Sequence, residues 1–444
     1  MKQTNKINRI PLALFDTIKN IKKIQLLDGI KLSFAQTDFE AVKNFLKEYD
    51  DNQATFNSYR REVERLLQWS WLTQNKSIFK LKRDDIEAYV SFCKNPPESW
   101  IGIAKVPRFI DENEERKPNS AWRPFVVTVS KVAAKNGTTP NVKQYSLSEK
   151  AIREIFAILG SFYKFLIQEN YAEINPVTQI RQKSKYFRKQ QTKTIIRCLT
   201  ELQWDTVIDT AKQLADANPK KHERTLFIMS ILYSMYLRVS ELVASKRWLP
   251  KMNDFRRDHD GNWWFTTVGK GNKERQIAVS DSMLDALKRW RKYLNLTPLP
   301  SIDDLTPLIP NTRGEGAISS TNQIRNIVQY CFDEAIKKLR EDGFIEEANG
   351  MQSATVHWLR HTGISDDIKR RPREHVRDDA GHSSSITTDK YIDVDLRERH
   401  SSAKKKLINR DEIPTKKNEP LISSHSQKSK KIYCALSLAN GGKQ

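Results

Sequence analysis

The stretch TLFIMSILYSMYLRVSEL (225–242), followed closely by MNDFRRDHDGNWWFTTVGKGNKERQIAVS (252–280), decides the fold. The first segment is almost wholly apolar up to Leu237, which predicts a buried helix at the centre of a domain. The second contains strand-like runs separated by turns at Asp260-Gly261 and at KGNK, which predicts a three-stranded antiparallel meander. A buried helix beside a small sheet predicts a mainly α fold with a small antiparallel β-sheet.

Helical patterns continue on both sides of this centre. Upstream, apolar residues recur at helical spacing from Phe56 to Leu67 and again from Asp84. A third pattern follows Ser146 and Glu149, which form a capping-box signature. Downstream, we expect helices over 199–214, over 282–296, around 321–341 and around 357–370.

The chain length of 444 residues predicts two or three domains at roughly 100–200 residues each. The changes of pattern predict a helical domain, a linker and a mixed α/β domain between two polar ends. The expected boundaries are an N-terminal arm over 1–50, the helical domain over 51–180 with an insertion over 95–140, the linker over 181–197, the mixed α/β domain over 198–400 and a basic, disordered tail over 401–444.

Charge is the strongest compositional signal. With 76 Lys and Arg against 54 Asp and Glu, the chain carries a formal charge of +22, which favours a polyanionic partner such as double-stranded DNA. Residues 181–200 hold seven basic and no acidic residues, with Tyr186 and Phe187 among them. A solvated loop is a common reading of such a run, but we expect this linker to lie along phosphates, through Lys183, Lys185, Arg188 and Lys189.

Other classes of function have little support in the sequence. The four cysteines lie far apart without CxxC pairs, and no GxxxxGK[ST] or GxGxxG loop occurs. We therefore expect no metal and no cofactor. The longest apolar stretch is too short for a membrane span, and the N-terminus has no secretory core, so we expect a cytoplasmic protein.

Four short segments place polar residues in apolar surroundings. They are LRVSEL with Arg238, VGKGNKER with Lys270, HWLRHT with His357 and Arg360, and AGHSSSITTDKY with His382 and Tyr391. In this order and spacing they resemble the catalytic domain of the tyrosine recombinases, the phage integrase family. The resemblance covers about 195–400, and the helical region over 50–180 looks like the core-binding domain of that family.

The chemistry of a phosphodiester explains why these residue types would gather. Because the phosphate is anionic, a site without a metal must supply fixed positive charge as the transition state forms. The guanidinium groups of Arg238 and Arg360 match phosphate oxygens bidentately. His357 lies one helical turn before Arg360, so both side chains can reach one phosphate. A lysine whose pKa is lowered by neighbouring arginines can protonate the leaving oxygen.

The resemblance implies the remaining roles. Tyr391, nine residues after His382, would attack phosphorus to give a 3′-phosphotyrosyl link, and Lys270 would be the general acid. It also implies a homotetramer that exchanges strands between two recombination sites, for integration or excision of a mobile element. The spacing alone does not decide between Lys270 and Lys273.

Two other functions stay open at this point. A type IB topoisomerase uses the same nucleophile and cations as a monomer on one duplex, and a non-catalytic DNA-binding architectural protein would need only the basic charge. Each residue alone also has an ordinary structural reading; only their joint order favours an enzyme. The sequence departs from the family where GISDDIKRRPREHVRDDA (363–380) is unusually charged and where Ala380 precedes Gly-His.

Overall fold

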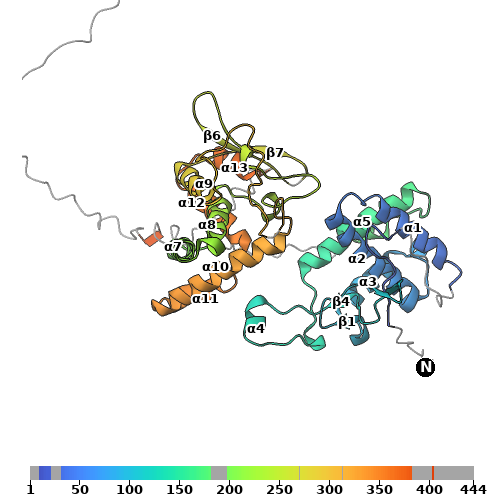
Figure 1. Cartoon of the computed structure of the whole chain (residues 1–444). Coiled ribbons are helices and arrows are strands. Elements are labelled where there is room, and N and C mark those ends of the chain that lie inside the picture. The colour runs from blue at the N-terminus through green and yellow to red at the C-terminus, as the bar shows by residue number, and fades with distance from the viewer. Residues whose placement is uncertain are drawn as a thin grey trace, which may run out of the picture.

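The computed structural model describes residues 10–21, 32–181, 198–269, 271–312, 314–382 and 403–404. The described residues build two lobes, each with its own hydrophobic core (Figure 1). We call residues 10–181 the N-terminal lobe and residues 198–382 the C-terminal lobe. Helices dominate and the strands form only small sheets, so the expected mainly α fold with a small antiparallel sheet is confirmed.

The N-terminal lobe is a helical bundle. Its helices are α1 (Ala35–Lys47), α2 (Gln53–Trp69), α3 (Arg83–Lys94), α5 (Glu149–Gln168) and α6 (Pro176–Arg181). The apolar stripe of α5 is buried, but its N-cap is Ser148, whose hydroxyl accepts the Ala151 N–H, rather than Ser146. The expected arm over 1–50 also differs: α1 and the segment around Phe15 belong to the core.

The expected insertion over 95–140 folds onto this bundle. Its strands are β1 (Ile101–Gly102), paired in parallel with β4 (Phe125–Val126), and β2 (Phe109–Glu112), paired antiparallel with β3 (Glu115–Pro118). Trp100 and Trp122 are buried. A short helix, α4 (Lys131–Lys135), follows and extends away from the bundle (Figure 1).

The C-terminal lobe is built around the apolar helix α8 (Pro219–Ser234), which packs against α7, α9, α10 and α12. Its other helices are α7 (Glu201–Ala217), α9 (Asp281–Tyr293), α10 (Thr321–Glu341), α11 (Ile345–Met351), α12 (Val356–Ile368) and α13 (Arg373–Ala380). The expected meander is present as β5 (Phe255–Arg257), β6 (Trp263–Val268) and β7 (Glu274–Ala278).

The sheet places a hairpin turn beside the end of α8. In the β6–β7 register Phe265 faces Ile277, and both are fully buried on the core face. The last pair of the ladder is Val268 with Glu274, so Gly269 and residues 271–273 lie in the connecting loop. The backbone of Gly271 has a φ of 79°, a conformation that favours glycine in a tight turn.

Helix α8 ends earlier than the apolar run suggests. Its last residue is Ser234, and Tyr236 then adopts a left-handed φ of 48°. Helix α12 approaches this end very closely, because a Cβ at Gly363 would overlap the carbonyl oxygen of Tyr233. The chain therefore turns sharply after α8 and delivers Arg238 to the start of a 3₁₀ turn (Val239–Glu241) rather than to the helix itself.

Several contacts between the lobes involve α4 and two loops. The ammonium of Lys131 donates to the Gln329 side chain and, at 2.8 Å, to the carbonyl of Ala354. Lys135 forms a 2.6 Å ion pair with Asp333 on α10. Elsewhere the Arg247 guanidinium lies 3.1 Å from the Asp51 carboxylate. The insertion thus contacts α10 and the residue two positions before α12.

Among the helices that the structure describes, none combines the length and apolar character that crossing a membrane requires.

Candidate active site

Arg238 is held by a carboxylate three residues away. Its backbone N–H donates to Glu241 Oε2 at 2.8 Å, and its guanidinium donates to Glu241 Oε1 at 2.9 Å. The Glu241 backbone carbonyl in turn accepts the Trp248 indole N–H at 3.0 Å. The Arg238 side chain remains 30% exposed, so its guanidinium is fixed in direction but still accessible.

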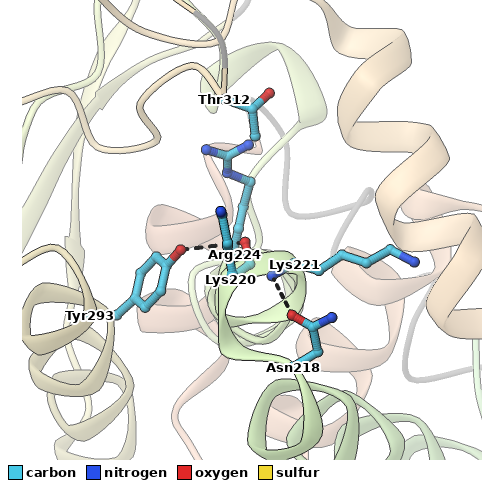
Figure 2. A pocket seen from close by; sticks show the side chains of 6 residues that line it. All are labelled: Asn218, Lys220, Lys221, Arg224, Tyr293 and Thr312. Atoms are coloured by element: carbon cyan, nitrogen blue, oxygen red, sulfur yellow. Dashed lines mark hydrogen bonds between the residues drawn. The ribbon is translucent and has the colours of Figure 1, made fainter.

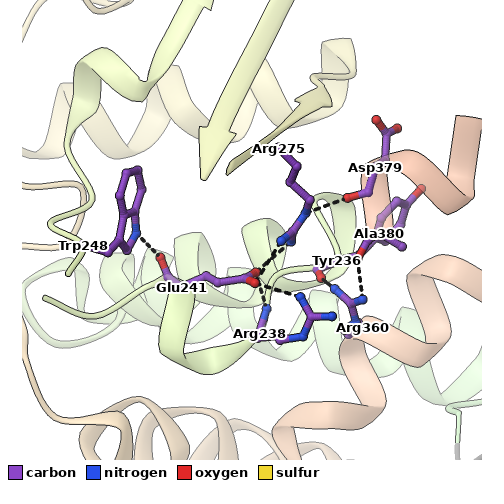
Figure 3. A network of polar contacts seen from close by, with 8 residues as sticks. All are labelled: Tyr236, Arg238, Glu241, Trp248, Arg275, Arg360, Asp379 and Ala380. Atoms are coloured by element: carbon purple, nitrogen blue, oxygen red, sulfur yellow. Dashed lines mark hydrogen bonds and ion pairs between the residues drawn. The ribbon is translucent and has the colours of Figure 1, made fainter. Parts of the chain in front are cut away.

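A second arginine from the sheet shares the same carboxylate. Arg275, on β7, donates to Glu241 Oε1 at 2.9 Å and to Glu241 Oε2 at 2.8 Å, and its Nε donates to the Asp379 carbonyl at 3.0 Å (Figure 3). Burial alone would raise the pKa of Glu241, but hydrogen bonds from Arg275 and Arg238 outweigh it and lower that pKa. Glu241 is therefore ionised, and one carboxylate orients two guanidinium groups.

The β6–β7 loop begins directly over this group. A Cβ built on Gly269 would lie 3.0 Å from Arg275 Nη1, 3.2 Å from Glu241 Oε1 and 3.5 Å from Arg238 Nη1. The Gly269 N–H also donates to the Lys273 carbonyl at 2.8 Å. Lys270 itself lies outside the described residues, but its chain neighbour Gly269 lies against the arginines.

Helix α12 supplies His357 and Arg360, the two residues of the HxxR pair. Arg360 is 3% exposed, and its guanidinium donates to the Tyr236 carbonyl and, at 2.6 Å, to the Ala380 carbonyl. These two carbonyls belong to residues two positions before Arg238 and two positions before His382. Figure 3 shows Arg360 rising from α12 between the segments that carry them. Ala380 is fully buried, so the small residue before Gly-His fits closely here.

The histidines lie within the field of these arginines. The pKa of His382 is lowered to about 4, mainly by burial and further by the charges of Arg360, Arg238 and Arg275. Burial and the charges of Arg360 and Arg238 also lower the pKa of His357. At neutral pH both imidazoles are therefore uncharged, and each can accept or donate a proton rather than add positive charge.

The structure thus brings together four of the six residues expected to be catalytic, Arg238, His357, Arg360 and His382. Tyr391 and Lys270 lie outside the described residues, as do the expected linker contacts Lys183, Lys185, Arg188 and Lys189. Sequence reasoning missed Glu241, Arg275 and the neighbouring His361. His361 packs edge-on against His357, with ring centroids 4.6 Å apart.

A signal for two of the missed residues was present in the motifs. Glu241 lies within LRVSEL, and Arg275 ends VGKGNKER. A glutamate three positions after the residue that begins a turn can accept that residue's backbone N–H, which is one half of a capping box. That pattern does not, however, indicate that the carboxylate would be shared with a strand.

The arrangement can bind and polarise a tetrahedral anion. Fixed guanidinium groups converge from the α8 turn, β7 and α12, and neutral imidazoles lie beside them. Donors that are held in place before reaction stabilise charge that develops on phosphate oxygens. Within the described residues, no group of three or more His, Cys, Asp or Glu side chains is arranged to hold a metal ion.

A separate basic hollow lies at the other end of α8. It encloses about 330 Å³ and is lined by Asn218, Lys220, Lys221, Arg224, Tyr293 and Thr312 (Figure 2). In this hollow the Tyr293 hydroxyl reaches the Lys220 carbonyl, and the Asn218 side chain caps the Lys221 N–H. Because α8 has 16 residues, its two ends are about 24 Å apart, so this hollow is not part of the arginine group.

Comparison with known proteins gives the class first. Residues 197–398 match the phage integrase family, which makes this part of the chain a tyrosine-recombinase domain. The protein is a site-specific recombinase, an enzyme that breaks and rejoins DNA strands.

Particular relatives extend the likeness upstream. The tyrosine recombinase XerC of Thermodesulfovibrio yellowstonii is 28% identical over 335 residues, which cover 74% of this chain and 92% of that protein. XerC of Leptospira interrogans is 26% identical over 260 residues, 57% of this chain and 70% of the relative. Among solved structures, XerH recombinase bound to a palindromic difH substrate is 15% identical over 87% of this chain and 92% of that one, with a TM-score of 0.48.

Proposed function

We propose that this enzyme cuts DNA through Tyr391, using the arginine group as its phosphate-binding site. The observation that carries the proposal is the convergence of Arg238 and Arg360 with two uncharged histidines, beside the loop that contains Lys270. A protein that only bound DNA would need positive charge but would not need guanidinium groups fixed around one point.

The proposed reaction is a transesterification that needs no outside energy source. The Tyr391 oxygen attacks phosphorus and loses its proton to a neutral imidazole of the group, and the bond from phosphorus to the 5′ oxygen breaks. Lys270 then protonates the leaving 5′ oxygen. The product is a 3′-phosphotyrosyl link and a free 5′ hydroxyl. Attack by a 5′ hydroxyl reverses the step, so the link conserves the phosphodiester for rejoining.

Duplex DNA is the proposed partner. The charge of +22, together with the linker over 181–197 between a helical core-binding domain and the catalytic domain, supports a protein that holds a duplex between its lobes. XerH is described bound to difH, and lambda integrase as a tetramer bound to a Holliday junction. We propose the same class of assembly here, four protomers on two sites, for integration or excision of a mobile element.

A suicide substrate tests the chemistry. A nicked duplex that carries the enzyme's own site should trap a covalent complex at the 3′ phosphate without metal or ATP. Tyr391→Phe should bind the same duplex and trap nothing, because only the attacking oxygen is lost. A 5′ link, or unchanged trapping by Tyr391→Phe, would reject the proposed nucleophile. Relaxation of plasmids that lack paired sites would favour a type IB topoisomerase.

A modified leaving group tests the acid. With the 5′ oxygen replaced by sulfur, the leaving group departs without a proton, so Lys270→Ala should regain cleavage while Arg238→Ala should not. Lys273→Ala is the matched control in the same loop. Rescue of Lys273→Ala instead of Lys270→Ala would move the acid by three residues.

The linker contacts are tested by salt. Replacing Lys183, Lys185, Arg188 and Lys189 by Gln should weaken binding to every DNA sequence alike and flatten the slope of log affinity against log salt concentration. An unchanged slope would remove the linker from the interface.

A further inference from the structure

The charged segment 363–380 contains an arginine that bridges the same two segments as Arg360. The Arg371 Nη1 donates to the Tyr236 hydroxyl at 3.1 Å, and its Nη2 donates to Asp379 Oδ2 at 2.6 Å. Arg360 reaches the backbone carbonyl of Tyr236 and that of Ala380, the residue after Asp379. Two guanidinium groups therefore connect the Tyr236 segment with the end of α13. Arg360 binds backbone carbonyls of the two segments, and Arg371 binds their side chains.

The bridge made by Arg371 is tied to the surrounding elements. The Tyr236 hydroxyl donates to the Asp367 carboxylate on α12, and the same carboxylate accepts from Arg371 at 3.1 Å. Asp379 Oδ1 accepts the Ala278 N–H of β7 at 3.3 Å. Arg371 thus connects the turn after α8 with α12, α13 and the edge of the sheet.

The apolar contacts around this bridge are few. Ile364, Val376 and Ala380 pack against the Tyr236 ring in a small cluster apart from the main core. A cluster of this size fixes the spacing of two segments weakly, whereas hydrogen bonds from a planar guanidinium fix both distance and direction. The unusual charge of 363–380 is therefore accounted for by a polar bridge where an apolar helix would otherwise pack.

We propose that Arg371 is a positioning residue, which sets the separation of the Tyr236 and Ala380 carbonyls and thereby the direction of the Arg360 guanidinium. This inference rests on the proposed role of Arg360 at the phosphate. Loss of the bridge should lower the rate of cleavage and leave DNA affinity unchanged, since the bridge consists of contacts from Arg371 to Tyr236 and Asp379, which are protein groups in the segments that hold Arg360.

The test compares Arg371→Met with Arg377→Met. Arg377 lies on α13 in an exposed pair with Asp378, so its loss makes the same change in charge without touching the bridge. Covalent-complex formation on a suicide substrate is measured under single-turnover conditions at saturating enzyme, and affinity is measured in a Tyr391→Phe background. We expect Arg371→Met to slow the rate about tenfold to a hundredfold, and Arg377→Met to match the parent. Equal rates for the two variants would overturn the proposal.

Two further variants separate positioning from stability. Arg371→Met leaves the buried Asp379 carboxylate without its arginine, and adding Asp379→Asn removes that charge. We expect the double variant to regain thermal stability but not rate, and Arg371→Lys, which can reach one partner at a time, to regain part of the rate. Full recovery of the rate in the double variant would show that Arg371 acts only on stability.

Arg360→Ala is measured in parallel, because it distinguishes the two possible failures. If Arg360→Ala cleaves at the parent rate, the proposed role of Arg360 is wrong. If Arg360→Ala is inactive while Arg371→Met is unaffected, the role of Arg360 stands and the positioning role of Arg371 is rejected.

Discussion

Arg65 and Arg108 of the N-terminal lobe differ from Arg275 of the C-terminal lobe in what packs against them. In the N-terminal lobe the guanidinium groups are covered by aromatic rings: Arg65 lies 4.4 Å from the Phe125 ring centroid, and Arg108 lies 4.4 Å from that of Trp122. In the C-terminal lobe Arg275 is instead approached by Gly269 and Gly381, neither of which has a side chain. The first arrangement covers a cation with an aromatic ring, and the second lets two backbone segments pack directly against it, because a methyl group on Gly381 would lie 2.8 Å from Arg275 Cδ.

Exposure separates Arg65 from Arg238. The Arg65 side chain is 8% exposed and pairs with the buried Glu62 at 2.8 Å. The Arg238 side chain is 30% exposed although it also pairs with a buried carboxylate. An arginine pair can therefore serve structure or chemistry, and what lies over the guanidinium distinguishes the two uses.

The largest expected effect is on the chemistry of the C-terminal lobe. Arg238→Gln should slow covalent-complex formation by about 10² to 10³, as expected for loss of one fixed donor to a developing anion. Its thermal unfolding should change little, because Glu241 keeps its two contacts with Arg275. Rapid-quench assays and calorimetry measure the two quantities. A large loss of stability with normal rate in the folded fraction would assign Arg238 to structure.

In the N-terminal lobe we expect the reverse. Glu62→Gln removes the buried charge that faces Arg65 and should cost about 3 kcal/mol of unfolding free energy. The rate of cleavage by the folded enzyme should be unchanged. Glu154→Gln is the matched control, because Glu154 forms an exposed pair with Arg61 and should cost less than about 1 kcal/mol. Similar losses for the two variants would contradict a special role for burial at Glu62.

Gly269→Ala should slow cleavage less than Arg238→Gln does. Gly269 packs against the guanidinium groups of Arg238 and Arg275. The added methyl would lie 3.0 Å from Arg275 Nη1 and 3.2 Å from Glu241 Oε1, so the guanidinium must move by a few tenths of an ångström. We expect the rate to fall about tenfold with stability nearly unchanged. Gly271→Ala, where nothing lies within 4 Å of the new methyl, serves as the control for backbone strain. A rate loss confined to Gly271→Ala would indicate strain in the loop rather than contact with the arginines.

The smallest effect near neutral pH concerns the histidines, all eight of which lie after residue 221. Burial and neighbouring positive charge lower the pKa values of His361 and His382 to about 4. Between about pH 6.5 and pH 4 the unfolded chain therefore binds more protons than the folded lobe, so stability falls as the pH falls through this window. Hydrogen exchange followed by mass spectrometry should show the C-terminal lobe loosening with acid, less steeply in His382→Gln. An unchanged slope in His382→Gln would remove that residue from the effect.

Local patterns predict the centre of the C-terminal lobe well. The apolar run that becomes α8 and the turns that separate β6 from its neighbours are signals carried by adjacent residues. Helix α1 was missed although Phe39, Val42 and Phe45 recur at helical spacing. Its buried Asp38 looks like a solvent-facing residue, but accepts hydrogen bonds from Trp71, Ser77 and Ile78, which are more than 30 residues away.

The residues of the site also fall into those that the sequence predicts and those that only the structure shows. The sequence order identifies Arg238, His357, Arg360 and His382 as a group through resemblance, and the structure places them together. It does not reveal that Glu241 would also hold Arg275, because that contact depends on how β7 lies against the turn after α8. Nor does it reveal the bridge made by Arg371, whose partners lie on three separate elements.

The contact of Lys131 with Ala354 links the separation of the lobes to the first turn of α12. Its ammonium donates to the Gln329 side chain on α10 and to the Ala354 carbonyl, two residues before α12. Because Ala354 is fully buried, its carbonyl would need another donor if Lys131 were removed. His357 lies in that first turn. The position of α4 beside α10 and the start of α12 are therefore coupled through one ammonium group.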